Sequence, residues 1–128
     1  LQNVAIIGAA GKIGSGIALL FAQEMTLQKL QPENRQKSYE LVLIDISSEA
    51  LQGLLAYLKT QVVKLAEKNI VNLRNLYHDR KDLVENQDMI NAFVDDLQVI
   101  LSTSTELGAA KNANLVFEAI VEDANVKV

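Results

Sequence analysis

The stretch that decides the fold reads Val4-Ala5-Ile6-Ile7-Gly8-Ala9-Ala10-Gly11-Lys12-Ile13-Gly14, and an apolar helical pattern follows it from Ser15 to Glu24. The apolar run 4–7 predicts a buried strand, and the glycine-rich segment 8–14 predicts a tight turn that leads into the helix. Glycine lets a backbone come close to a pyrophosphate, and the free N–H groups at a helix amino terminus attract anions. The stretch therefore predicts the start of a dinucleotide-binding βαβ unit, with residues 8–14 as its phosphate turn.

The glycine spacing in this turn is longer than usual. Gly8, Gly11 and Gly14 form G-x-x-G-x-x-G, whereas the dinucleotide-binding fingerprint is G-x-G-x-x-G. Ala10 stands where the shorter form has its middle glycine. A structural alternative is that Gly14 and Gly16 only let the helix pack closely on the strand. The extra residue alters how the helix presents its N–H groups, so we expect weaker cofactor binding but not the loss of the site.

Composition places the chain among single-domain α/β proteins. Its 128 residues are 49% hydrophobic and 22% charged, with one proline and no cysteine, which argues for a packed core and against disulfides or thiolate zinc sites. The net charge of −4 without a basic cluster argues against nucleic-acid partners, and no apolar run is long enough to cross a membrane. The chain begins without Met or a secretory signal. We therefore expect residues 1–128 to be one domain of a longer, cytoplasmic polypeptide.

Three further apolar runs predict strands at residues 40–45, 99–101 and 115–120. With the strand at 4–7 they alternate with helical segments, as in a doubly wound parallel sheet of the Rossmann-like α/β class. We predict the strand order 3-2-1-4. In that order the chain reverses between the first and fourth strands, so a ligand binds beyond the carboxyl ends of these two strands.

A helical hairpin is predicted between the second and third strands. Leucines at helical spacing predict a long helix over residues 48–68 with Ser48 as its cap. A loop at 69–82 follows, and a weaker amphipathic pattern predicts a second helix around 89–97. The sequence therefore predicts an excursion of two antiparallel helices rather than a simple crossover.

Two shorter features complete the pattern along the chain. Thr103 and Glu106 have the spacing of a capping box for a brief helix. The polar segment 26–38, which contains the only proline, predicts an inserted surface loop between the first helix and the second strand. Such a loop lies at the end of the sheet opposite the phosphate turn, so we expect the cofactor site to tolerate it.

Asp45 ends the second predicted strand, at the position from which a carboxylate accepts hydrogen bonds from the adenosine ribose. Its charge repels a 2′-phosphate, and neither Ile46 nor Ser47 supplies a cation for one, so the sequence favours NAD over NADP. The alternative is that Asp45 caps the next helix. Asp45 follows Gly14 by 31 residues instead of about 20, and the insertion at 26–38 accounts for the excess.

Three quoted segments carry a family resemblance: Gly14-Ser-Gly-Ile-Ala with Phe21-Ala-Gln, then Val42-Leu-Ile-Asp45, then Ala113-Asn-Leu-Val-Phe-Glu-Ala-Ile-Val-Glu-Asp with Val126-Lys127. They resemble the first helix, the second strand and the fourth strand with its following turn in the NAD-binding domain of the 3-hydroxyacyl-CoA dehydrogenases. The resemblance covers almost the whole chain. It implies an enzyme that transfers hydride between L-3-hydroxyacyl-CoA and NAD in fatty-acid β-oxidation.

The resemblance also implies which residues contact the two ligands. The implied cofactor contacts are Gly8, Ala9, Ala10, Gly11, Lys12, Ile13, Gly14, Asp45, Ala119, Glu122 and Lys127. The implied contacts to the coenzyme A part of an acyl-CoA substrate are Gln61, which stands in place of a serine, and Lys68. Both lie with Lys64 on one polar stripe of the predicted helix, and the alternative is that this stripe is only a solvated face.

Catalytic residues are not expected within this chain. In the family a histidine removes the 3-hydroxyl proton and a glutamate orients it, and both follow the fourth strand. The only histidine here, His78, lies in a predicted surface loop, and the acids of the chain show no metal-ligand pattern. We therefore expect this chain alone to bind NAD without turning over substrate. The resemblance further implies a homodimer formed through a C-terminal domain beyond this chain.

Two alternative functions stay open at this point. One is a related dehydrogenase that acts on a 3-hydroxy acid or a carnitine-like substrate. The other is a non-catalytic module that binds NAD(H) or serves in protein interaction, because a fold alone does not fix a function.

Overall fold

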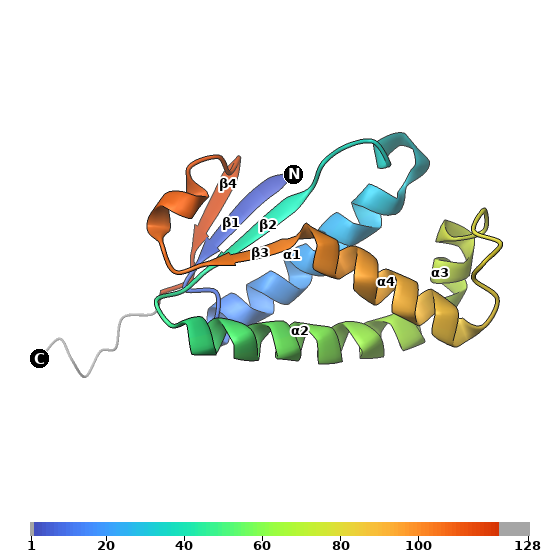
Figure 1. Ribbon diagram of the computed structural model, residues 1–128, viewed down its shortest axis with the longest axis horizontal. Coiled ribbons are helices and arrows are strands. Elements are labelled where there is room, and N and C mark those ends of the chain that lie inside the picture. Colours follow the sequence, from blue (N-terminus) through green and yellow to red (C-terminus); the bar gives the residue numbers. More distant parts are fainter. Residues whose placement is uncertain (1, 121–128) are drawn as a thin grey trace, which may run out of the picture.

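The computed structural model describes residues 2–120 as one α/β unit (Figure 1). Its sheet has four parallel strands in the order β3-β2-β1-β4, which confirms the predicted class and strand order. The strands are β1 (Asn3–Ile7), β2 (Glu40–Ile44), β3 (Leu101–Ser104) and β4 (Leu115–Glu118). Because β1 pairs with both β2 and β4, its carboxyl end lies at the centre of one edge of the sheet.

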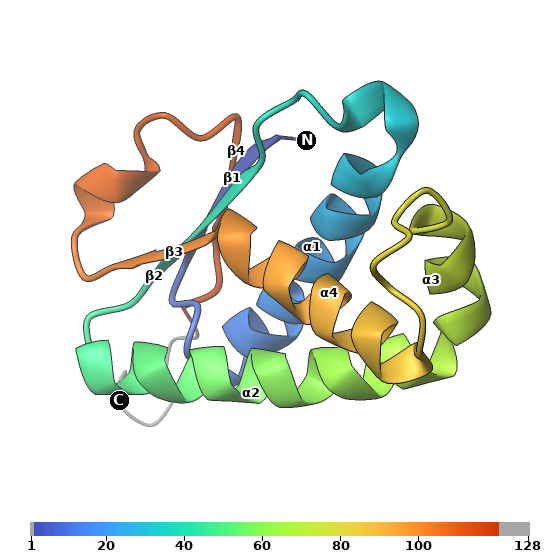
Figure 2. The same cartoon turned by 45° about the vertical axis from the view of Figure 1, so that its right-hand side comes forward.

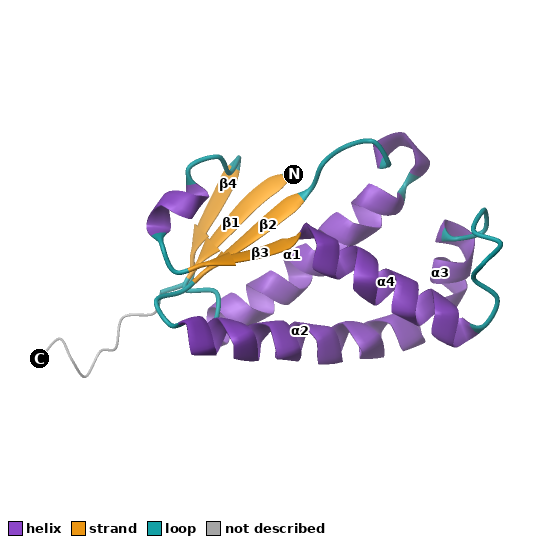
Figure 3. Cartoon of the chain, in the orientation of Figure 1, coloured by secondary structure: helices purple, strands orange, loops and turns teal. Residues whose placement is uncertain are grey.

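Helices lie on both faces of this sheet (Figure 3). The larger layer consists of α1 (Lys12–Leu30), α2 (Ser48–Lys68) and α4 (Asn86–Ile100), while the 3₁₀ helix η2 (Leu107–Ala110) lies on the opposite side. Each strand contributes side chains to the cores on both faces of the sheet, because successive side chains point to opposite faces. Ile6 and Leu43 pack with the large helical layer, whereas Ala5 and Val42 pack near Ala110 of η2.

The excursion between β2 and β3 contains three helices. Figure 2 shows α2 along the lower edge of the molecule, α4 packed above it and α3 (Ile70–Leu76) between them in the chain. The predicted loop at 69–82 is therefore wrong for residues 70–76. Leu73 explains the extra helix, because its side chain is 1% exposed and joins the core shared with α4.

Helix α1 is longer than the predicted segment 15–24. It continues to Leu30, so the first part of the predicted surface insertion is helical. Thr26 is fully buried within it, and its hydroxyl donates to the carbonyl oxygen of Ala22 at 2.7 Å. That hydrogen bond satisfies the polar group inside the core. The remaining connection to β2 contains the 3₁₀ helix η1 (Pro32–Asn34).

Two predictions around β3 are wrong. The strand predicted at 99–101 begins only at Leu101, because α4 extends through Ile100 and joins β3 without a connecting loop. Thr103 lies inside β3 and so does not form the predicted capping box. The amide of Glu106, which is the N-cap of η2, donates instead to the hydroxyl of Ser104 at 3.0 Å.

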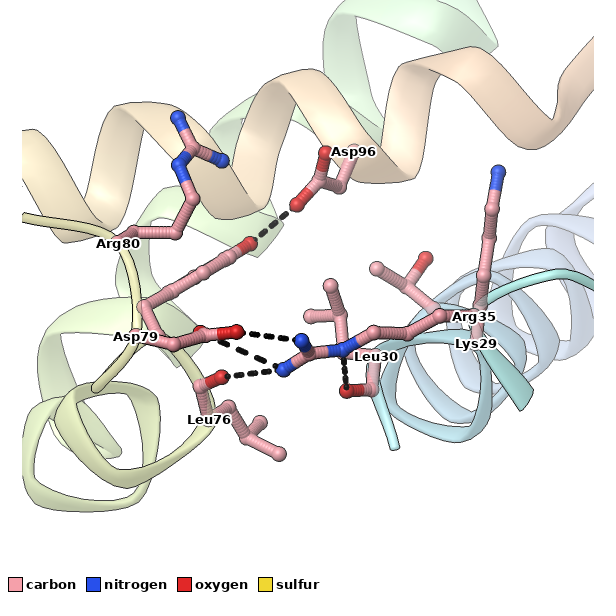
Figure 4. Close-up of a pocket in the computed structure, with 9 residues that line it drawn as sticks. Lys29, Leu30, Arg35, Leu76, Asp79, Arg80 and Asp96 are labelled. Carbon is pink, nitrogen blue, oxygen red and sulfur yellow. Dashed lines mark hydrogen bonds and ion pairs between the residues drawn. The ribbon is translucent and has the colours of Figure 1, made fainter. Parts of the chain in front are cut away.

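Arg35 ties the connection after α1 to the α3 end of the excursion (Figure 4). Its guanidinium pairs with Asp79 at 2.5 Å and also donates to the carbonyl oxygens of Leu30 and Leu76, each at 3.4 Å. Leu30 ends α1 and Leu76 ends α3, so the cation lies where the partial negative charges of two helix dipoles converge. The Arg35 hydrogen bond also lowers the pKa of the Asp79 carboxyl.

A cavity of about 230 Å³ lies beside this cluster, between α1, α3 and α4. Within it the hydroxyl of Tyr77 donates to the carboxylate of Asp96 at 2.5 Å. Burial and that carboxylate raise the pKa of Tyr77, so the phenol stays protonated as a donor. Among the charged side chains around the cavity, Arg35 pairs with Asp79 and Asp96 accepts from Tyr77, so the cavity is a junction between α1, α4 and the loop after α3.

Candidate functional site

A cleft of about 660 Å³ opens at the carboxyl ends of β1, β2 and β4. Its volume falls within the roughly 300–1,000 Å³ typical of ligand sites. The loops that follow β1 and β2 meet at this edge of the sheet (Figure 3). The lining residues are Ile7, Gly8, Gly11, Lys12, Ile13, Ile44, Asp45, Ile46, Thr105, Leu107, Ala119 and Ile120. The cleft is therefore at the switch point between β1 and β4, as predicted from the strand order.

The turn between β1 and α1 requires glycine at two positions. Gly8 has a φ of +77°, a conformation that side chains with a Cβ rarely adopt. A Cβ on Gly14 would lie 2.2 Å from the carbonyl oxygen of Gly8 and 2.8 Å from the Cα of Ala9. Because Gly14 has no side chain, the first turn of α1 can lie directly against the end of β1. Gly16, by contrast, has open space where a Cβ would lie, so it plays no part in this close packing.

The first amides of the turn are engaged within the protein. Those of Gly8 and Ala9 donate to the carbonyl oxygen of Ile44 at 2.8 and 3.0 Å, and that of Gly11 donates to Gly8 at 3.1 Å. The amide of Ala10 donates to the Oδ2 atom of Asp45 at 3.0 Å. The turn is therefore fixed against the carboxyl end of β2.

The amides that follow are free to meet a ligand. In the described part of the chain, those of Lys12, Ile13 and Gly14 donate to no acceptor. Gly11, the N-cap of α1, brings no capping side chain, and the first helical turn contains no acidic residue. These free N–H groups and the positive end of the helix dipole form a site for an anion, with the Lys12 side chain at its rim.

Asp45 lines the same cleft as this helix terminus. Its amide donates to the carbonyl oxygen of Ser104 at 3.2 Å, and its Oδ1 atom accepts from the amide of Ser47 at 3.4 Å. The N-cap of α2 is Ser47, whose hydroxyl accepts from the amide of Ala50 at 3.1 Å. Neither the predicted Ser48 cap nor the alternative in which Asp45 caps the helix is correct. The carboxylate of Asp45 therefore lines the cleft with Oδ1 only weakly engaged.

The family model described as 3-hydroxyacyl-CoA dehydrogenase, NAD binding domain, matches residues 3–128. The chain belongs to this family. NAD is accordingly the cofactor of this dehydrogenase domain, and the cleft fits it: free helix amides can meet the pyrophosphate, and a carboxylate can meet the adenosine ribose. A search of curated protein sequences found no match.

Three solved structures of longer chains resemble this domain. The (S)-3-hydroxybutyryl-CoA dehydrogenase PaaH1 from Ralstonia eutropha is 23% identical, with a TM-score of 0.63 over 100% of this chain and 34% of its own. The 3-hydroxybutyryl-CoA dehydrogenase from Escherichia coli K12 is 25% identical, with a TM-score of 0.58 over 99% of this chain and 20% of its own. FadB2 from M. tuberculosis is 23% identical, with a TM-score of 0.50 over 99% of this chain and 33% of its own. These likenesses show the Rossmann-like fold, and the domain spans about a third or less of each neighbour.

The structure brings together most of the cofactor residues expected from the sequence. Those that line the cleft are Gly8, Gly11, Lys12, Ile13, Asp45 and Ala119, while Ala9, Ala10 and Gly14 support the turn behind them. Glu122 and Lys127 lie outside the described residues. Gln61 and Lys68 of α2 do not line the cleft: Gln61 is half-buried and Lys68 is exposed.

Sequence reasoning missed the apolar wall of the dehydrogenase cleft. Ile46, Leu107 and Ile120 line it although they are 93%, 66% and 68% exposed. Exposed apolar side chains gathered at one site indicate a ligand with apolar faces, such as the rings of a dinucleotide. Their positions just after strands were the available signal, because the carboxyl ends of parallel strands share one edge of the sheet.

His78 and the acidic residues within residues 2–120 form no metal centre at the cleft. His78 is exposed in the loop after α3, and its Nδ1 atom lies 2.7 Å from the carbonyl oxygen of Asn75. That part of the chain contains no group of three or more side chains placed to hold a metal ion. None of its helices combines the length and apolar character that a bilayer span requires.

Proposed function

We propose that this NAD-binding domain serves an enzyme that transfers hydride between L-3-hydroxyacyl-CoA and NAD in fatty-acid β-oxidation. One observation carries the proposal: the free amides at the start of α1 and the carboxylate of Asp45 face the same cleft. Family membership supports the reaction class. The base that removes the 3-hydroxyl proton is then supplied by residues outside the described domain, because His78 is remote from the cleft.

The cofactor lies across the carboxyl ends of the strands in this proposal. The pyrophosphate accepts hydrogen bonds from the amides of Lys12, Ile13 and Gly14, and the Lys12 side chain adds a positive charge. Asp45 accepts from the adenosine ribose and repels a 2′-phosphate, which selects NAD over NADP. Ala119, Glu122 and Lys127 supply further contacts beyond β4, on the strength of the family resemblance.

The acyl-CoA substrate contacts α2 through Gln61 and Lys68. With Lys64 these residues follow one polar stripe of a helix of 21 residues, about 31 Å long at 1.5 Å per residue. The stripe offers two cations and an amide to a phosphate-bearing ligand. We further propose that the full protein is a cytoplasmic homodimer whose contacts lie outside this domain and that it binds no nucleic acid.

Oxidation of NADH by the protein that carries this domain tests the proposed reaction. We expect turnover with acetoacetyl-CoA and at least about a hundredfold lower kcat/KM with free acetoacetate, because binding energy from the coenzyme A portion contributes to catalysis. Lys68→Ala is expected to raise KM for the thioester while leaving KM for NADH unchanged. Lys59→Ala, an exposed lysine elsewhere on the same helix, is the matched control. Absence of turnover with the thioester contradicts the proposal.

A further inference from the structure

A long-range hydrogen bond holds the phosphate turn to the end of β2. The amide of Ala10 donates to the Oδ2 atom of Asp45 at 3.0 Å, and the two residues lie 35 positions apart along the chain. Gly8 and Ala9 both bond to the carbonyl oxygen of Ile44, the residue before Asp45. Gly8, Ala9 and Ala10, three consecutive residues of the turn, are thus fixed to the end of β2.

The contact lies in a glycine turn that is one residue longer than the usual dinucleotide-binding fingerprint. The spacing G-x-x-G-x-x-G leaves one more N–H between β1 and α1 than G-x-G-x-x-G does. Ala10 is half-buried, so an unpaired amide here would lose solvent contacts without compensation. Its bond to an ionised acceptor satisfies that amide and fixes the path of the chain into Gly11 and α1.

We infer that Asp45 is a positioning residue for the phosphate turn as well as a ribose ligand. Oδ2 holds Ala10 before any nucleotide binds, which positions the free amides of Lys12 and Ile13 at the cleft. Oδ1, with only the 3.4 Å contact to Ser47, remains available to the adenosine ribose. This inference rests on the proposed cofactor site, and it assigns the two carboxylate oxygens different tasks.

Hydrogen exchange of the Ala10 amide in the nucleotide-free protein tests the positioning role. Asp45→Asn keeps an acceptor oxygen without the charge, whereas Asp45→Ala removes the acceptor. We expect exchange to stay within about threefold of wild type in Asp45→Asn and to rise at least about tenfold in Asp45→Ala. Asp45→Leu, which keeps the side-chain volume, replaces the alanine variant if that variant does not fold. Equal exchange in all forms overturns the inference.

Binding of 2′,3′-dideoxyadenosine diphosphate provides the second readout. This probe has a pyrophosphate but no 2′- or 3′-hydroxyl, so it cannot form the ribose hydrogen bonds to Asp45. Because both variants lack the charge of Asp45, their comparison excludes a simple electrostatic effect. We expect Asp45→Asn to bind the probe at least about fivefold more tightly than Asp45→Ala. Equal affinities contradict the positioning role, while wild-type binding of NADH separately tests the proposed cofactor site.

Discussion

Gly14→Ala is expected to lower the free energy of unfolding by about 3 kcal/mol, at the upper end of the cost of overpacking. The new Cβ would lie 2.2 Å from the carbonyl oxygen of Gly8 and 2.9 Å from that of Ala9. Both neighbours are backbone, so α1 or the phosphate turn must shift. Because that shift moves the free amides of Lys12 and Ile13, we also expect NADH affinity to fall at least about tenfold. Urea unfolding and calorimetry measure the two effects.

Gly16→Ala is the matched control on the same helix. No atom lies within 4 Å of the Cβ that it would add, and alanine is favoured over glycine in a helix interior by roughly 0.5–1 kcal/mol. We therefore expect a small increase in stability and unchanged NADH affinity. If Gly14→Ala behaves like Gly16→Ala, α1 does not pack against β1 as closely as described here.

Leu58→Ala is expected to cost about 3 kcal/mol of stability, within the range measured for leucine truncation in cores. Leu58 is fully buried on α2 and lines a small cavity together with Val94 and Leu97 of α4. Its removal enlarges that cavity and weakens the packing of the excursion on the core. Thermal or urea unfolding of the purified variant gives the value.

Leu20→Ala is the control for the leucine truncation. Leu20 is 68% exposed on α1. We therefore expect the free energy of unfolding of Leu20→Ala to lie within about 0.5 kcal/mol of wild type. The two variants remove the same atoms and differ in burial. A loss below about 1 kcal/mol for Leu58→Ala would show that α2 and α4 do not share one core with the sheet.

The strand order and the cofactor end of the sheet were predictable because they depend on strong local patterns. The strands at 4–7 and 40–44 read as continuous apolar runs, which is typical of parallel strands covered on both faces. The glycine turn and the acid after the second strand mark the ends of these strands. Since parallel strands share one carboxyl edge, the sequence was enough to place Asp45 opposite the start of the first helix.

The boundaries that failed are places where burial outweighs local preference. Val99 and Ile100 are β-branched, which favours a strand. Both lie in α4 because Phe93, Leu97 and Ile100 form one buried helical face, while Val99 is 72% exposed. Thr26 is the opposite case: a polar residue predicted for a loop is buried, because its hydroxyl bonds to the preceding helical turn. Neither outcome follows from composition alone.

The hydrogen bonding of the phosphate turn was beyond sequence reasoning. The family resemblance implies that every position from 8 to 14 contacts the cofactor, without distinguishing the amides. In the structure the early amides bond to Ile44, Gly8 and Asp45, whereas those of Lys12, Ile13 and Gly14 find no acceptor among residues 2–120. That division depends on the distance between the turn and the end of β2, which long-range packing sets.

Calorimetric titration of the wild-type protein with NADH and with NADPH is the decisive measurement for the cofactor site. We expect NADH to bind through the free amides of α1 and the carboxylate of Asp45. NADPH is then expected to bind at least about tenfold more weakly, because its 2′-phosphate meets that carboxylate. Equal affinity for the two nucleotides, or no binding of NADH at millimolar concentration, would contradict this expectation.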